Sequence, residues 1–133
     1  MKTIVVIDAQ GGGIGKQIIT EICKRNLDVE IIAVGTNSAA ATAMKKAGAH
    51  YAATGENPVV VNARRADYIM GPIGIAVADS MFGEITPAMA VAIGQSDAVK
   101  VLIPINSCGT FIAGVEEKGL KGYIDDAIDR ISE

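Results

Sequence analysis

The chain has 133 residues, half of them hydrophobic, and a net charge of −3 at neutral pH. This length is typical of one domain, so we expect residues 1–133 to form a single unit with a buried core. The absence of a basic cluster and the scarcity of aromatic residues argue against nucleic-acid binding. No apolar run is as long as a membrane span and no secretory leader is recognisable, so we expect a cytoplasmic protein.

The hydrophobic fraction is high for a small monomer. A second subunit covering an apolar surface would account for it, and predicts a homo-oligomer, with a dimer favoured. A parallel sheet buried on both faces would account for it equally well. The composition leaves both explanations open.

The most informative stretch is the first. Four apolar residues, Ile4 to Ile7, predict a strand over residues 3–7 that is buried on both faces. A glycine-rich loop follows at residues 8–13, and an amphipathic helix is predicted over residues 14–25. Helix N-termini expose unpaired N–H groups and carry partial positive charge, so a strand, glycine loop and helix in this order favour phosphate binding.

The rest of the chain continues the alternation of strands and helices. Apolar runs predict four more strands, at residues 29–34, 49–53, 67–70 and 98–103. Capping residues and helical periodicity predict helices at residues 39–47, 58–65, 87–95 and 120–131. Asn37 or Ser38 caps the first of these, and Thr86 caps the third. Residues 110–115 follow the fifth strand too closely for a helical crossover, so they are predicted to add an antiparallel edge strand.

This pattern predicts a three-layer, Rossmann-like α/β fold. We expect a mostly parallel sheet of five strands in the order 3-2-1-4-5, with the extra strand at one edge and helices on both faces. The chain turns away in opposite directions after the first and fourth strands, which opens a crevice at their carboxyl ends. The glycine loops at 8–13 and 71–74 are both predicted to face that crevice.

The first glycine loop matches nucleotide-binding motifs only in part. Gly11 and Gly13 fit the dinucleotide pattern G-x-G-x-x-G, but Lys16 occupies the third position. Thr36 and Asn37 follow the second strand, where that pattern has an acidic residue for the ribose.

The other two motifs fit less well. Gly15-Lys16 matches part of the P-loop, but Gln10 and Gln17 replace its first glycine and its hydroxyl residue. The short-chain dehydrogenase loop is matched only near Gly13-Ile14-Gly15, and no tyrosine is followed four residues later by lysine. ATP hydrolysis and dehydrogenase chemistry are therefore not supported.

We predict that phosphates lie on the first glycine loop, that a ribose lies toward the end of the second strand, and that the second loop forms the opposite wall. The predicted contact residues are Asp8, Gln10, Gly11, Gly12, Gly13, Ile14, Gly15, Lys16, Thr36, Asn37, Gly71, Pro72, Ile73 and Gly74. A tight strand-to-helix connection with no ligand is the alternative, in which Asp8 caps loop N–H groups and Lys16 is solvated.

Other residues give only weak indications of chemistry. His50 is the only histidine, and a lone histidine is more often structural than catalytic. Cys108 is either a reactive thiol near the crevice or an inert turn residue. Cys23 is predicted to be a small buried hydrophobe on the first helix. Asp79 and Glu84 could form an acid–base pair, although a structural role is favoured. Two distant cysteines and one histidine lack the spacing of a zinc site, so no metal is predicted.

Five segments together resemble a family of short bacterial proteins classed as a domain of unknown function. They are residues 8–16, 35–37, 53–57, 71–75 and 83–87. The resemblance covers nearly the whole chain. It implies that these motifs belong to one site, with a Rossmann-like nucleotide-binding loop as the working interpretation.

The sequence thus favours a protein that binds NAD(P) or another nucleotide, in a binding or regulatory role. One alternative is a small enzyme acting on a phosphorylated metabolite or nucleotide. Another is an oligomeric interaction module with no small-molecule ligand.

Overall fold

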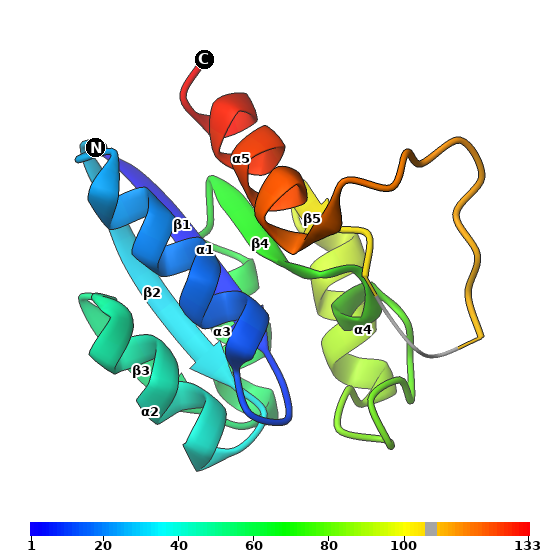
Figure 1. Cartoon of the computed structure of the whole chain (residues 1–133). Helices are drawn as coiled ribbons and strands as arrows, with labels where there is room; N and C mark the ends of the chain where they lie inside the picture. The colour runs from blue at the N-terminus through cyan, green and yellow to red at the C-terminus, as the bar shows by residue number, and fades with distance from the viewer. Residues whose placement is uncertain (106–108) are drawn as a thin grey trace.

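The computed structural model describes residues 1–105 and 109–133 as alternating strands and helices (Figure 1). The strands are β1 (Lys2–Asp8), β2 (Val29–Gly35), β3 (Tyr51–Thr54), β4 (Tyr68–Pro72) and β5 (Val99–Ile103). The helices are α1 (Gly13–Lys24), α2 (Ser38–Ala47), α3 (Glu56–Ala63), α4 (Pro87–Gln95) and α5 (Gly119–Ile131), with a 3-10 turn, η1 (Ile73–Ala76). None of the helices in these described parts is long and apolar enough to cross a membrane.

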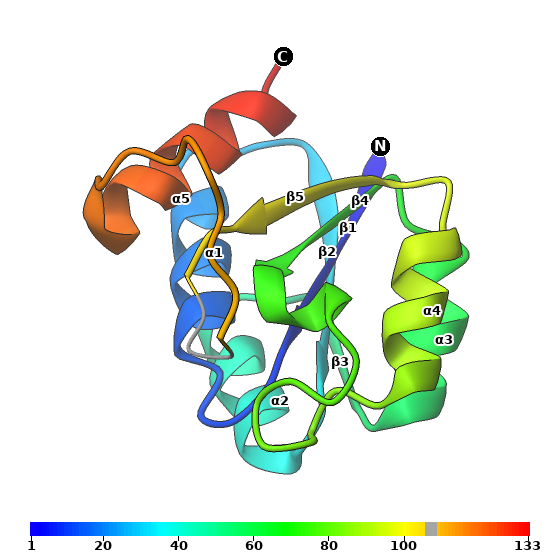
Figure 2. The ribbon, with the colours of Figure 1, turned by 90° about the vertical axis from the view of Figure 1, so that its right-hand side faces the viewer.

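The five strands form one sheet in the order β3-β2-β1-β4-β5, and every neighbouring pair is parallel. The predicted Rossmann-like α/β class and strand order are confirmed. Figure 2 shows α1 and α5 on one side of the sheet and α3 and α4 on the other. The helix α2 packs on the α1 side, since its Met44 belongs to the same core cluster.

The central strand explains why two cores form. Successive side chains of a strand point to opposite faces. Ile4 and Val6 accordingly enter the core beneath α1, α2 and α5, whereas Val5 and Ile7 enter the core beneath α3 and α4. All four side chains are fully buried, which is why this strand is a continuous apolar run instead of an alternating one.

Two helix starts were predictable from their capping residues. The Asn37 side chain accepts a hydrogen bond from the Ala40 N–H (2.9 Å) at the start of α2. The Thr86 hydroxyl accepts one from the Met89 N–H (3.2 Å) at the start of α4, where Pro87 is the first helical residue. The predicted boundaries of these helices are correct to within one residue.

The predicted antiparallel edge strand over residues 110–115 is wrong. None of these residues is in a strand, and they belong to an arm, residues 109–118, that runs outside the sheet (Figure 1). Gly109 and Gly114 have left-handed backbones, with φ of 69° and 82°. Such residues interrupt extended structure, and only four residues separate these two.

Cys23 is also a correction, because it is exposed. The buried stripe of α1 consists of Gly15, Ile18, Ile19 and Ile22. Cys23 lies just beyond that stripe and faces Gly48, where an added Cβ would lie 2.7 Å from the Cys23 sulfur.

Candidate functional site

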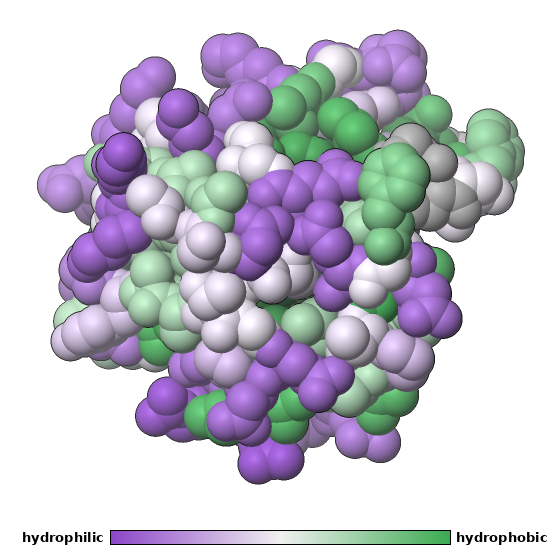
Figure 3. Space-filling view, turned by 90° about the horizontal axis from the view of Figure 1, so that it is seen from below, coloured by the Kyte–Doolittle hydropathy of each residue, from purple (hydrophilic) through white to green (hydrophobic). Residues whose placement is uncertain are grey.

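The carboxyl ends of the strands open onto one face of the molecule, on which hydrophilic and hydrophobic residues are interspersed (Figure 3). A cavity of about 330 Å³ lies there. Its lining comes from the loop after β1, the start of α1, the end of β4 and two further loops, and consists of Asp8, Ala9, Gln10, Gly11, Gly12, Gly13, Ile14, Pro72, Met81 and Ile105. Since β1 and β4 are neighbours, the cavity lies at the switch point of the sheet, as predicted.

Of the three adjacent glycines in this cavity, only the middle one is required by the fold. Gly12 has φ of 74°, and a Cβ there would lie 2.9 Å from the Cα and O atoms of Ala40 in α2. Gly11 and Gly13 have no left-handed φ, and an added Cβ at either would meet nothing within 4 Å. Both are exposed, and neither N–H group donates a hydrogen bond to another described residue.

Asp8 caps the glycine loop and α1 from within the protein. Its carboxylate is buried and accepts hydrogen bonds from the N–H groups of Ala9 (2.8 Å) and Gly15 (2.7 Å). Gly15 is the third residue of α1, whose first turn has no side-chain cap of its own. The carboxylate therefore satisfies a helix N–H group that would otherwise be unpaired.

Glu84 ties the loop between η1 and α4 to the ends of β1 and β2. Its Oε1 atom accepts hydrogen bonds from the Thr36 hydroxyl (2.6 Å), the Asn37 side-chain amide (2.8 Å) and the Gln10 N–H (3.0 Å). The Asn37 amide also donates to the Gln10 carbonyl (2.9 Å). These bonds hold the glycine loop to the end of β2.

The two carboxyl groups differ in their acid strength. Burial raises the pKa of Asp8 above its ordinary value of 3.8, although the N–H groups of Gly15, Ala9 and Ile14 oppose this, and the charge of Glu84 raises it further. The hydrogen bond from Thr36 is the main cause that lowers the pKa of Glu84 below its ordinary value of 4.5. Glu84 is therefore ionised near neutral pH, and it adds negative charge close to the loop.

Seven of the fourteen predicted site residues line the cavity. They are Asp8, Gln10, Gly11, Gly12, Gly13, Ile14 and Pro72. The other seven do not line it. Gly15 and Gly71 are buried, and Ile73 and Gly74 lie in η1. Lys16 lines a separate hollow beside α2, and the Thr36 and Asn37 side chains donate hydrogen bonds to Glu84.

Met81 and Ile105 also line the cavity and were not predicted. Ile105 lies two residues after the end of β5, so its position just beyond a strand was the available signal. Met81 lies in a loop where Asp79, Met81 and Phe82 all have positive φ (64°, 55° and 58°). Residues with side chains rarely adopt this conformation, and the types of Met81 and Phe82 gave no indication of it.

His50, Cys108 and Asp79 are the other residues for which the sequence suggested chemistry. The Nδ1 atom of His50 accepts a hydrogen bond from the Ile31 N–H (2.9 Å), next to β3, which ties the edge of the sheet together. Cys108 lies outside the described residues, so its proximity to the cavity stays a prediction. Asp79 is exposed in the loop that carries Glu84.

The fold and the cavity define the class: a Rossmann-like α/β protein with a glycine-lined cavity at the switch point of its sheet. The chain belongs to the family described as "Domain of unknown function (DUF3842)", which it matches over residues 3–133. Comparison with curated proteins found no match.

Among solved structures, the chain is similar to a dodecameric FMN-dependent UbiX-like decarboxylase from Escherichia coli O157:H7. The two share 14% sequence identity with a TM-score of 0.49, over 100% of this chain and 96% of the other.

Proposed function

We propose that this protein binds a nucleotide-like small molecule in the cavity and acts as a binding or regulatory protein. In this proposal one phosphate group accepts hydrogen bonds from the free N–H groups of Gly11 and Gly13 at the start of α1. An apolar ring system packs against Ile14, Pro72, Met81 and Ile105.

The observation that carries the proposal is the presence of glycine at positions 11 and 13. Each glycine costs roughly 0.5–1 kcal/mol of backbone entropy relative to alanine. Neither position has a left-handed backbone or a crowded Cβ, so nothing in the described residues requires glycine there. A ligand that comes close to the backbone does require it.

The size and charge of the cavity favour a single phosphate over a dinucleotide. At about 330 Å³ the cavity is near the lower end of the usual range for small-molecule sites, roughly 300–1,000 Å³. The ionised Glu84 supplies negative charge beside the loop, which repels further phosphates. Thr36 and Asn37, predicted for a ribose, already donate to Glu84.

Binding is preferred over catalysis because the nearby carboxylates are engaged. Asp8 accepts two backbone hydrogen bonds, and Oε1 of Glu84 accepts three. Both groups hold the loop in place, which is a positioning task and favours binding over catalysis.

The first experiment is mass spectrometry of the purified protein under native and then denaturing conditions, which detects and identifies a retained ligand. Calorimetric titration with AMP, GMP, UMP, FMN and NAD follows. We expect a mononucleotide to bind more tightly than NAD. Failure of the whole panel to bind, with no retained molecule, would refute the proposal.

Gly13→Asp supplies the specific test. The new carboxylate would lie beside the bound phosphate. Two unit charges about 4 Å apart near a protein surface repel by about 4 kcal/mol. The affinity for the nucleotide should therefore fall at least tenfold. An acidic residue at the first position of a helix does not destabilise the helix. Ser38→Asp, the same addition at the first residue of α2 and outside the cavity, is the matched control. Equal affinity in both variants would contradict the proposed phosphate position.

A further inference from the structure

The edge of the sheet at β5 is uncovered along much of its length, as Figure 2 shows. Within the described residues β5 pairs only with β4. An exposed strand edge presents unpaired backbone groups, and monomeric proteins often protect it with a lysine. The lysine of this strand, Lys100, does not serve that purpose, because its ammonium donates to the Ser96 carbonyl (2.6 Å) at the end of α4.

Exposed apolar side chains belong to β5 and to the segment that joins β5 to α5. Phe111 is 89% exposed, and Val99 and Val115 are about half exposed. Phe111 and Val115 belong to the arm, residues 109–118, which runs beyond β5 and returns to α5 (Figure 1). Residues 109–115 of the arm make no hydrogen bond to any other described residue. The far end of the arm is fixed, since the Tyr123 hydroxyl donates to the Glu116 carbonyl (2.8 Å).

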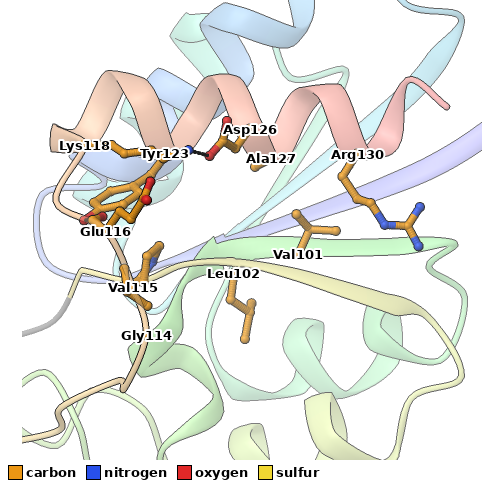
Figure 4. Close-up of a pocket in the computed structure, with 11 residues that line it drawn as sticks. Val101, Leu102, Gly114, Val115, Glu116, Lys118, Tyr123, Asp126, Ala127 and Arg130 are labelled. Carbon is orange, nitrogen blue, oxygen red and sulfur yellow. Dashed lines mark hydrogen bonds and ion pairs between the residues drawn. The ribbon is translucent and has the colours of Figure 1, made fainter.

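A hollow of about 470 Å³ lies between β5, the arm and α5 (Figure 4). Its apolar walls include Val101, Leu102, Val115 and Ala127. The hollow is distinct from the glycine-lined cavity, with which it shares no lining residue.

We propose that a second copy of this chain covers this edge. In the proposed dimer the β5 strands of the two copies pair antiparallel about a two-fold axis, and Phe111 of each arm packs on the partner copy. A two-fold interface uses the same surface on both subunits, and the exposed edge, the apolar arm and the hollow together supply both halves of such a contact.

Charge complementarity supports the antiparallel arrangement. Glu116 lies near the arm end of the hollow and Arg130 near the other end, beside Val101 (Figure 4). A two-fold axis through β5 reverses the partner, which brings its acidic Glu116-Glu117 pair toward Arg130. Arg130 pairs with Glu133 of its own chain (2.9 Å), but both side chains are more than half exposed. Such a surface pair contributes little, so the partner's carboxylates can compete for the guanidinium.

The available area is compatible with a stable dimer. Fully extended, the ten residues of the arm would span at most about 33–36 Å. A strip of that length and about 10 Å wide on each arm would bury at most about 1,300 Å² in total. The left-handed backbones of Gly109 and Gly114 shorten the arm below that limit, and the β5 pair adds to the area. A specific interface needs about 1,000 Å².

Sedimentation equilibrium of the full chain tests the proposal. We expect the wild-type protein to be a dimer and Phe111→Asp to weaken dimerisation roughly tenfold or more, because an exposed apolar anchor is replaced by a charge. Phe82→Asp is the matched control, since Phe82 is 96% exposed but lies in the loop between η1 and α4. Phe111 is exposed in the isolated chain, so its replacement leaves the fold intact, which circular dichroism checks.

A charge exchange tests the orientation. Arg130→Glu should weaken the dimer, and adding Glu116→Lys and Glu117→Lys in the same chain should restore it. A monomeric wild-type protein, a dimer indifferent to Phe111→Asp, or equal weakening by Phe82→Asp would overturn the interface. Failure of the exchange to restore the dimer would overturn the antiparallel arrangement. None of these outcomes depends on a ligand.

Discussion

The three adjacent glycines allow a sharp test of how this loop is built. Changing each to alanine in turn should separate the residue that the fold requires from the two that it does not. We expect Gly12→Ala to destabilise the protein strongly, and Gly11→Ala and Gly13→Ala to leave its stability equal or higher.

The magnitude for Gly12→Ala follows from two costs. A left-handed backbone costs a residue with a Cβ roughly 1–2 kcal/mol. The new Cβ would also lie 2.9 Å from the backbone of Ala40, and overpacking of this kind costs about 1–3 kcal/mol. The sum, about 2–5 kcal/mol, is a large share of the stability of a small protein. Gly13→Ala, by contrast, should stabilise by about 0.4–1 kcal/mol, because it reduces the freedom of the unfolded chain.

Urea unfolding followed by circular dichroism measures these differences, provided that the slope against denaturant stays constant across the series. The corresponding fall in Tm for Gly12→Ala is about 6 °C or more. If Gly12→Ala were within about 0.5 kcal/mol of the wild type, the packing of the glycine loop against α2 would be wrong. If Gly13→Ala destabilised by more than about 1 kcal/mol, glycine there would have a structural role, and the main support for a ligand would be lost.

Three further predictions concern the polar contacts around the loop. Asn37→Ala should cost about 1–2 kcal/mol in urea unfolding, because α2 loses its cap and Glu84 loses a donor; a cost near zero would contradict both contacts. Glu84 has a lowered pKa, so its stabilising effect is present above pH 4.5 and is lost as the pH falls through the pKa of the folded state. Glu84→Gln should therefore flatten the acid side of a plot of unfolding free energy against pH. Asp8 has a raised pKa, so its contribution to stability is present below pH 3.8 and is lost as the pH rises through the pKa of the folded state. Asp8→Asn should remove this decline in unfolding free energy. An unchanged plot would argue against burial as the cause of the raised pKa.

Much of the fold could be predicted because its signals are local. The apolar run Ile4–Ile7 identified the central strand. The alternation of strands with helices indicated a parallel sheet, for which 3-2-1-4-5 is one of the common strand orders. Asn37 and Thr86 marked helix starts because short polar side chains accept bonds from the first turn. The loop after β1 and the end of β4 could be brought together before the structure was known, since parallel strands share one carboxyl edge.

The predicted site residues that lie outside the cavity depend on contacts between residues far apart in sequence. Thr36 and Asn37 have the chemistry to bind a ribose, but Glu84 reaches them from 47 or 48 residues away and accepts their hydrogen bonds. That reach depends on a loop with several left-handed residues that are not glycine, such as Met81 and Phe82. Lys16 matched a motif by its type, but its position on α1 directs it to a different hollow.

The central position of β1 also affects how the chain folds as it is synthesised. β1 leaves the ribosome before the other four strands, and β2, one of its two neighbours, follows soon after it, at Val29. Its other neighbour begins at Tyr68. At about 5–20 residues per second, the second side of β1 stays without its partner for several seconds after the strand has emerged. During that interval the four residues Ile4–Ile7, all fully buried in the folded protein, lie on a strand with an open edge. We expect a nascent chain stopped before Tyr68 to be retained by chaperones or to aggregate.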